Sequence, residues 1–449
     1  MRDPEISRNT SPSSVDRLPM MASWKWFAAM GLVGTILAPA CSCERDCRDT
    51  ATCESETGGG GVGGTASAAG GEGGLGDGGS GAMGTGGSGG GEQIVAPVAI
   101  GAGAAHTCVA LSDGSVWCWG SNFAGQLGEG SFGYVTGGLE RSTVPIQTMF
   151  EDAGNVVVGG GNHTCATKDD GTAWCWGRNE FGQLGDGTED DRALPVAVST
   201  LSGVETLSAS FDHTCAVAGG QVKCWGLGET AQLGDGNITD ASVPVDAAVG
   251  PSSDVATIDG SSCAVLDSGS VSCWGAGPLG NGSAQGSLTP VTVSGISNAS
   301  MIAGGAGHFC VLQDGGAVSC WGDNQNKQVN NSTNTPILSP AQGAASAFSA
   351  LEIGLGNAHS CVLSNDEVAC WGMAELQGQL VDVGTAFPIA GLAGETPTHL
   401  AVGGSHACVI TDMRNVYCWG MNDEGQLGDG TTAAAVSAVK VQATWQIPD

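Results

Sequence analysis

Basic side chains are scarce in this sequence. Of its 449 residues, 14 are Lys or Arg and 45 are Asp or Glu, which gives a formal net charge of −31. Binding to nucleic acid requires Lys and Arg clustered on one surface. The composition therefore excludes nucleic acid as an expected partner.

Motifs of catalysis are also missing. The sequence has no P-loop and no His-Glu-x-x-His. Its one Gly-x-Ser-x-Gly match, at 86–90, lies in a Gly-rich run without the strand and the helix that a nucleophile elbow needs. We predict no catalytic residue, no metal site and no cofactor, and therefore a protein that is not an enzyme.

The first 92 residues are predicted to direct export and to tether the rest of the chain. Residues 1–40 resemble a signal peptide region, with Met20 or Met21 as an alternative start and an apolar run, 27–38, that is too short to span a bilayer. A small residue before Cys41 is similar to a bacterial lipobox, in which the Cys becomes lipidated. We expect a bacterial outer-membrane or cell-surface lipoprotein that meets the membrane only through a lipid on Cys41. Plain secretion and an uncleaved anchor are the alternatives.

The segment that follows is rich in glycine. Residues 41–92 predict a disordered, flexible linker, because such a composition buries too little apolar surface to order itself. The pairing of Cys43, Cys47 and Cys53 in this segment stays open.

Residues 93–449 contain seven copies of one repeat. Each copy has Cys-Trp-Gly, with a second Cys nine or ten residues earlier and, in six copies, a His two residues before that Cys. Each predicts four short strands separated by Gly or Asp-Gly turns; in the second copy they are 156–158, 163–168, 172–177 and 195–198. Repeated four-stranded units of this length predict an all-β propeller.

The pattern Gly-x-x-His-x-Cys-x-Leu-x-x-Asp-Gly-x-Val-x-Cys-Trp-Gly-x-Asn-x-x-Gly-Gln-Leu-Gly resembles the regulator of chromosome condensation repeat family. The resemblance covers 93–449 and implies a seven-bladed β-propeller of four-stranded antiparallel blades. Two copies depart from the pattern: the fourth has Ser261 for His, and the fifth has Lys327-Gln328-Val329-Asn330 for Gly-Gln-Leu-Gly. We expect those blades to be less regular.

The resemblance also implies protein recognition on one face of the propeller. Its nuclear members exchange nucleotide on a small GTPase and bind chromatin, which we do not expect of an exported acidic chain. Secreted bacterial members inhibit β-lactamases through exposed aromatic residues. We expect a monomeric extracytoplasmic scaffold that binds an unidentified protein or glycan, with a secreted enzyme inhibitor or a propeller lyase or hydrolase as alternatives.

The cysteine spacing predicts one disulfide inside each repeat. The three-residue turn Ser112-Asp113-Gly114 suits a type I turn with a bulge, and counting back from it places Cys108 opposite Cys118. In the third copy the spacing and the turn are both one residue shorter, so the cysteines still face each other within disulfide range. The seventh copy departs from this pattern, because Arg414 stands where Gly is expected in the turn. The predicted pairs are Cys108–Cys118, Cys165–Cys175, Cys215–Cys224, Cys263–Cys273, Cys310–Cys320, Cys361–Cys370 and Cys408–Cys418.

Other repeated residues have a structural and a functional interpretation. The Trp of Cys-Trp-Gly is expected to fill the space between neighbouring sheets, with ligand stacking as the alternative. The six His are expected to make structural hydrogen bonds, with a metal-binding ring as the alternative. The Gly-Asp-Gly-Thr runs at 185–188 and 428–431 favour tight turns over calcium loops.

One insertion stands out as a contact site. Residues 129–141 form the longest insertion between repeat motifs and carry Phe132 and Tyr134. Exposed aromatic side chains are favoured anchors of protein contacts. We therefore predict that Phe132 and Tyr134 contact the partner.

Overall fold

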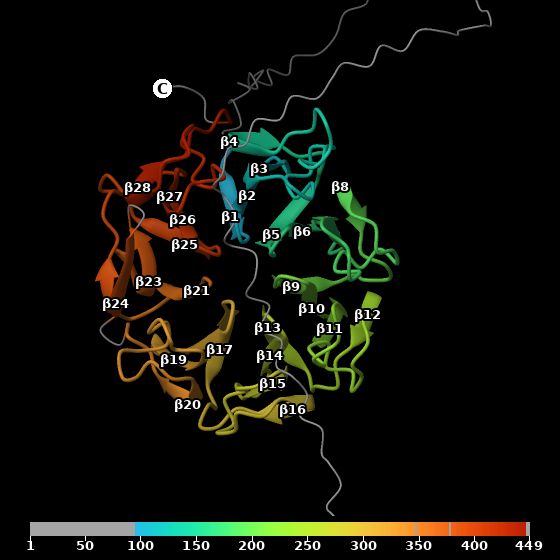
Figure 1. The fold of residues 1–449 in the computed structure, drawn as a ribbon, viewed down its shortest axis with the longest axis vertical. Helices are drawn as coiled ribbons and strands as arrows, with labels where there is room; N and C mark the ends of the chain where they lie inside the picture. The colour runs from blue at the N-terminus through green and yellow to red at the C-terminus, as the bar shows by residue number, and fades with distance from the viewer. Residues whose placement is uncertain (1–94, 346–347, 377–378, 446–449) are drawn as a thin grey trace, which may run out of the picture. The chain divides into compact units, whose positions relative to one another are not determined.

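The computed structural model describes residues 95–345, 348–376 and 379–445, without the side chains of 374–384. Within these ranges it contains strands and no α-helix. Its 28 strands form seven separate four-stranded antiparallel sheets that are arranged in a ring (Figure 1). The predicted seven-bladed β-propeller is therefore confirmed. The leader, the linker and Cys41, Cys43, Cys47 and Cys53 lie outside the described residues. In the described part of the chain, no helix is long and apolar enough to cross a membrane.

Each blade takes four consecutive strands of the chain. The strands of blades 1 to 4 are β1 (Pro97–Ala102), β2 (His106–Leu111), β3 (Val116–Ser121), β4 (Arg141–Gln147), β5 (Ala153–Gly159), β6 (His163–Lys168), β7 (Ala173–Gly177), β8 (Arg192–Ala197), β9 (Val204–Ala209), β10 (His213–Ala218), β11 (Gln221–Gly226), β12 (Ala241–Asp246), β13 (Ser252–Ile258), β14 (Ser261–Leu266), β15 (Val271–Gly275) and β16 (Ser287–Thr292). Those of blades 5 to 7 are β17 (Ala299–Gly304), β18 (His308–Gln313), β19 (Ala317–Gly322), β20 (Ile337–Gln342), β21 (Glu352–Leu355), β22 (His359–Leu363), β23 (Val368–Leu376), β24 (Gln379–Pro388), β25 (Pro397–Val402), β26 (His406–Thr411), β27 (Val416–Gly420) and β28 (Ala435–Lys440).

The order of strands fixes which loops share a face of the propeller. The first strand of each blade lies innermost and the fourth outermost (Figure 1). Because neighbouring strands are antiparallel, the connection from the first to the second strand and that from the third to the fourth emerge on the same face. The insertion in blade 1 belongs to a connection of this second kind, between β3 and β4.

The two cysteines of every repeat face each other in register. Cys108 is the Cα partner of Cys118, and the Cα atoms of this disulfide lie 4.1 Å apart. All seven predicted pairs are disulfides in the structure. Arg414 takes a left-handed backbone with φ of 62°, close to that of Gly114 at 82°, so the seventh turn keeps the same register.

The repeated Trp side chains fill the seams between blades, as predicted. Trp176 of blade 2 is fully buried in one cluster with Cys108, Cys118 and Leu127 of blade 1. Its indole Nε1–H donates to the carbonyl oxygen of Gln126 at 2.9 Å. The Gly-Gln-Leu-Gly loop of one blade thus supplies both a Leu side chain and a carbonyl acceptor to the next blade.

Two blades depart from the regular pattern: blade 4, which was expected to do so, and blade 6, which was not. In blade 5, Lys327 takes a positive φ of 59° where blades 1, 2 and 7 have Gly, and the Gln328 carbonyl still accepts from Trp371. The expectation for this blade was therefore wrong, because one strained residue preserves the loop. In blade 4, Pro278 stands at the Gln position and Trp321 Nε1 has no hydrogen-bond partner in the described structure. In blade 6, β23 and β24 continue into a long hairpin instead of the loop.

Candidate functional site

The β3–β4 connection of blade 1 carries both predicted contact residues. The rings of Phe132 and Tyr134 stack with centroids 5.1 Å apart, and Phe123 lies 5.6 Å from Tyr134. The side chains of Phe123 and Tyr134 are 61% and 51% exposed. These three residues form an aromatic cluster (Phe123, Phe132, Tyr134), a kind of surface that anchors protein contacts.

A single buried side chain holds this connection in place. Asn122 is fully buried, and its Nδ2 donates to the Glu129 carboxylate at 2.9 Å and to the carbonyl oxygens of Ser131 and Leu139 at 3.2 and 3.0 Å. Its Oδ1 accepts the Leu127 N–H at 2.9 Å. Asn122 therefore ties both ends of the insertion to the blade, and this fixes the backbone that presents the aromatic cluster.

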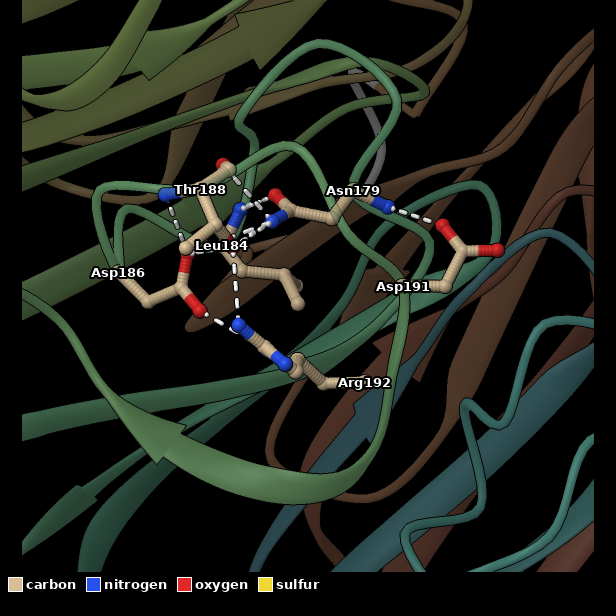
Figure 2. Close-up of polar contacts among 6 residues, drawn as sticks. All are labelled: Asn179, Leu184, Asp186, Thr188, Asp191 and Arg192. Atoms are coloured by element: carbon tan, nitrogen blue, oxygen red, sulfur yellow. Dashed lines mark hydrogen bonds and ion pairs between the residues drawn. The ribbon is translucent and has the colours of Figure 1, made fainter.

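The β7–β8 connection of blade 2 uses the same device (Figure 2). Asn179 donates through Nδ2 to the Thr188 carbonyl and through its backbone N–H to Asp191, at 2.9 and 2.8 Å. Asp186 accepts the N–H and the hydroxyl of Thr188 and pairs with Arg192 at 3.0 Å (Figure 2). The carboxylate in this Gly-Asp-Gly-Thr run is thus occupied by turn and ion-pair contacts. Among the described residues, no group of acids, His or Cys is arranged to hold a metal ion.

A groove lies between these two connections. It has a volume of about 630 Å³. One wall is formed by Phe132 and Tyr134 of blade 1, and the rest of its lining by Arg178, Glu180, Glu189, Asp190 and Asp191 of blade 2. The structure thus brings the two predicted contact residues together and adds an acidic wall from the next repeat.

The groove is lined by more acidic than basic side chains. Its one base, Arg178, is paired with Glu180 and with Asp212, the latter at 3.5 Å. Glu189 and Asp190 make no hydrogen bond or ion pair with another described residue. Desolvation and, after it, the negative charge of Asp191 raise the pKa of Tyr134. The phenol ring therefore lies in the field of the acidic wall.

The repeat histidines lie inside the seams between blades. His106 of blade 1 is fully buried, and its Nε2 lies 2.8 Å from Thr164 Oγ1 of blade 2. Burial lowers its pKa to about 4, and that of His163 to about 3. These rings are neutral at neutral pH and act as structural hydrogen-bond partners, as predicted. The Thr at 164 is a partner that the sequence did not reveal.

The central channel is lined by few polar side chains. A cavity of about 70 Å³ in it is lined mainly by Gly and Ala at the ends of the innermost strands, with Ser210, Phe211 and Asn357 among the few larger side chains. This lining contains no acid and no His.

The sequence revealed only half of the groove. Phe132 and Tyr134 stood out because the insertion that carries them is long. Phe123 was missed because it occupies a variable position of the repeat. The acidic wall was missed because its residues lie more than fifty positions further along, although the run Glu189-Asp190-Asp191 in the equivalent loop was a visible signal.

The fold defines the class: a disulfide-bonded seven-bladed β-propeller, here with an aromatic and acidic groove on one face. Models of the regulator of chromosome condensation (RCC1) repeat match residues 113–167, 170–217 and 415–443, and a second RCC1 repeat model matches 98–126, 156–183, 302–328 and 398–426. The chain therefore contains RCC1 repeats in the segments that these models match.

Among curated relatives, the chain is 36% identical over 109 residues to Protein RCC2 homolog of Danio rerio, which is 24% of this chain and 21% of that protein. It is 28% identical over 340 residues to the E3 ubiquitin-protein ligase HERC2 of Mus musculus, which is 76% of this chain and 5% of that protein. The chain thus spans only a small part of these relatives.

Solved structures show the same fold. Human WBSCR16 is 20% identical with a TM-score of 0.65, over 74% of this chain and 94% of that one. Prp20p of Saccharomyces cerevisiae is 18% identical with a TM-score of 0.61, over 74% of this chain and 87% of that one.

Proposed function

We propose that this protein is a non-enzymatic scaffold that binds another protein outside the cytoplasm. The observation that carries this proposal is the exposed aromatic cluster beside a groove on one face of the propeller. Large aromatic rings supply much of the binding energy at protein interfaces when a partner covers them. The glycine-lined channel supports a binding role, because its lining offers no acid or His for proton transfer.

The cysteines support a location outside the cytoplasm. Seven disulfides are consistent with an oxidising compartment. We propose that a lipid on Cys41 holds the chain at the bacterial envelope and that the propeller acts as a monomer. Labelling cells with a clickable palmitate analogue tests the anchor: the wild type should be labelled and Cys41→Ala should not.

Capture of the partner tests the binding role. The intact protein is immobilised and exposed to the solubilised envelope of the producing cell. Wild type should enrich one protein saturably, and the double variant Phe132→Ala/Tyr134→Ala should lose it. Tyr134 is exposed and Phe132 is half-buried, so the variant should stay folded, and thermal unfolding measured beside the wild type checks this. Undiminished capture by a folded variant contradicts this site.

A secreted enzyme inhibitor remains the second candidate. The same aromatic cluster favours this alternative, because an inhibitor of this kind would bind its target enzyme through exposed aromatic side chains. Identification of the captured protein as an enzyme, with its activity lost in the complex, would support this alternative.

A further inference from the structure

We propose that the groove between blades 1 and 2 binds a basic peptide segment of the partner, with a Lys or Arg side chain held between the aromatic cluster and the acidic wall. This inference rests on the proposed function, because it takes the groove to be the partner-binding site. The inference adds which kind of side chain the partner places in the groove.

The first argument is the geometry of the groove. Phe132 and Tyr134 form one wall, and Glu189, Asp190 and Asp191 belong to the same lining. A cation near the face of an aromatic ring is attracted by the electrons of the ring. The long apolar stem of Lys or Arg packs on the rings while its charged end reaches the carboxylates. A groove with one aromatic and one acidic side therefore matches both parts of a basic side chain.

The second argument is the pairing of the charges. Arg178, the base in the lining, is already engaged by Glu180 and Asp212. Glu189 and Asp190 have no basic partner among the described residues, and both are exposed. In the same loop Asp186 pairs with Arg192, and in the equivalent loop of blade 7 Glu424 pairs with Arg141. Glu189 and Asp190 thus present negative charge beside the aromatic rings that a basic partner can neutralise.

The third argument is the preorganisation of the two walls. Asn122 fixes the aromatic insertion, and Asn179 fixes the loop that carries the acids, partly through its bond to Asp191. A surface that is already ordered loses little conformational entropy when a ligand binds. The net charge of −31 also steers basic segments toward the protein at low ionic strength.

Short peptides test the chemistry directly. The probes are acetylated tetra-arginine amide and tetra-citrulline amide, which has nearly the same shape without the charge. Calorimetry with the intact protein should show one saturable site for tetra-arginine that weakens as salt is raised, and no measurable site for tetra-citrulline. Equal binding of the two probes overturns the inference.

Variants locate the site. Glu189→Gln/Asp190→Asn should weaken tetra-arginine binding roughly threefold to thirtyfold, the range expected for two exposed ion pairs. Tyr134→Ala should weaken it about twofold to fivefold, whereas Tyr134→Phe, which keeps the ring, should not. The matched control Glu151→Gln/Asp267→Asn removes the same two charges from exposed acids outside the groove, and it should leave binding unchanged. Equal losses in the two double variants would mean only long-range attraction and overturn the inference.

The two proposals fail in different ways. If Phe132→Ala/Tyr134→Ala abolishes capture of the envelope partner but Glu189→Gln/Asp190→Asn does not weaken it, the binding site stands and the basic segment is wrong. If the aromatic variant captures the partner as well as the wild type does, the proposed binding site itself is wrong.

Discussion

The imidazole Nε2 of His406 in blade 7 lies 2.7 Å from the hydroxyl oxygen of Thr107 in blade 1, although 299 residues separate them. Thr107 also donates to the Gln426 carbonyl at 3.2 Å, which accepts the Trp119 indole N–H at 2.8 Å. Each sheet consists of four consecutive strands. The ring is therefore closed by side-chain contacts between blades 7 and 1. Among the described strands, none from one end of the chain joins the sheet formed at the other end.

Thr107→Val is expected to lower the free energy of unfolding by about 1–3 kcal/mol. The substitution keeps the shape of the side chain but leaves the buried His406 N–H without an acceptor. Denaturant unfolding followed by Trp fluorescence measures the loss.

Thr164→Val is the matched control for this prediction. Thr164 makes the same contacts with His106 and the Gln126 carbonyl at an internal seam, so it should cost a similar amount. Wild-type stability in both variants would show that the His–Thr contacts contribute nothing.

Acid is expected to unfold the propeller through its buried histidines. Burial lowers the pKa of His163 in the folded chain to about 3, from an ordinary value of 6.5. Between these pH values the unfolded chain binds a proton that the folded chain does not, so stability is full above pH 6.5 and is lost as pH falls toward 3. His163→Gln should reduce the slope of stability against pH by about 1.4 kcal/mol per pH unit in this window. Parallel curves for the variant and the wild type would contradict the assignment.

Asp254 is expected to act in the opposite direction. Its carboxylate accepts the N–H groups of Val255 and Ile302 at 2.9 Å, and burial raises its pKa from 3.8 to about 6. The folded chain therefore holds a proton that the unfolded chain releases between these values, and stability falls as pH rises from about 4 to about 6. Unfolding at pH 4 and pH 8 measures this.

The variant Asp254→Asn cannot titrate at this position. Its stability relative to the wild type should improve by roughly 3 kcal/mol between pH 4 and pH 8, since a shift of about two pKa units corresponds to that free energy. A difference between variant and wild type that does not change with pH would refute the role of this carboxyl group.

Loss of one disulfide is expected to destabilise the blade that contains it. Cys108→Ala/Cys118→Ala should cost roughly 2–3 kcal/mol from a loop of about ten residues, plus the packing lost against Trp176. Label on Cys41, Cys43, Cys47 and Cys53, which lie outside the propeller, is not counted in this experiment. Intact mass after alkylation without reductant checks the pairing: the wild-type propeller should take up no label on its fourteen cysteines, whereas label on them before reduction would contradict the seven disulfides.

The sequence by itself determined the features that depend on neighbours along the chain. Turn length sets the register of a hairpin, so the spacing from Cys108 to Cys118 and the shorter spacing from Cys215 to Cys224 each predicted facing cysteines. Turn residues within each repeat likewise predicted four strands, and the length of the insertion at 129–141 pointed to Phe132 and Tyr134.

Only the tertiary structure decided what meets across a seam. The groove joins Tyr134 to Glu189 and Asp190, and ring closure joins Thr107 to His406. These pairs depend on the angle and distance at which one sheet packs on the next, which the volume of side chains such as Trp176 and Leu127 determines. No spacing within a repeat carries that information, because each seam is made by residues from two different repeats.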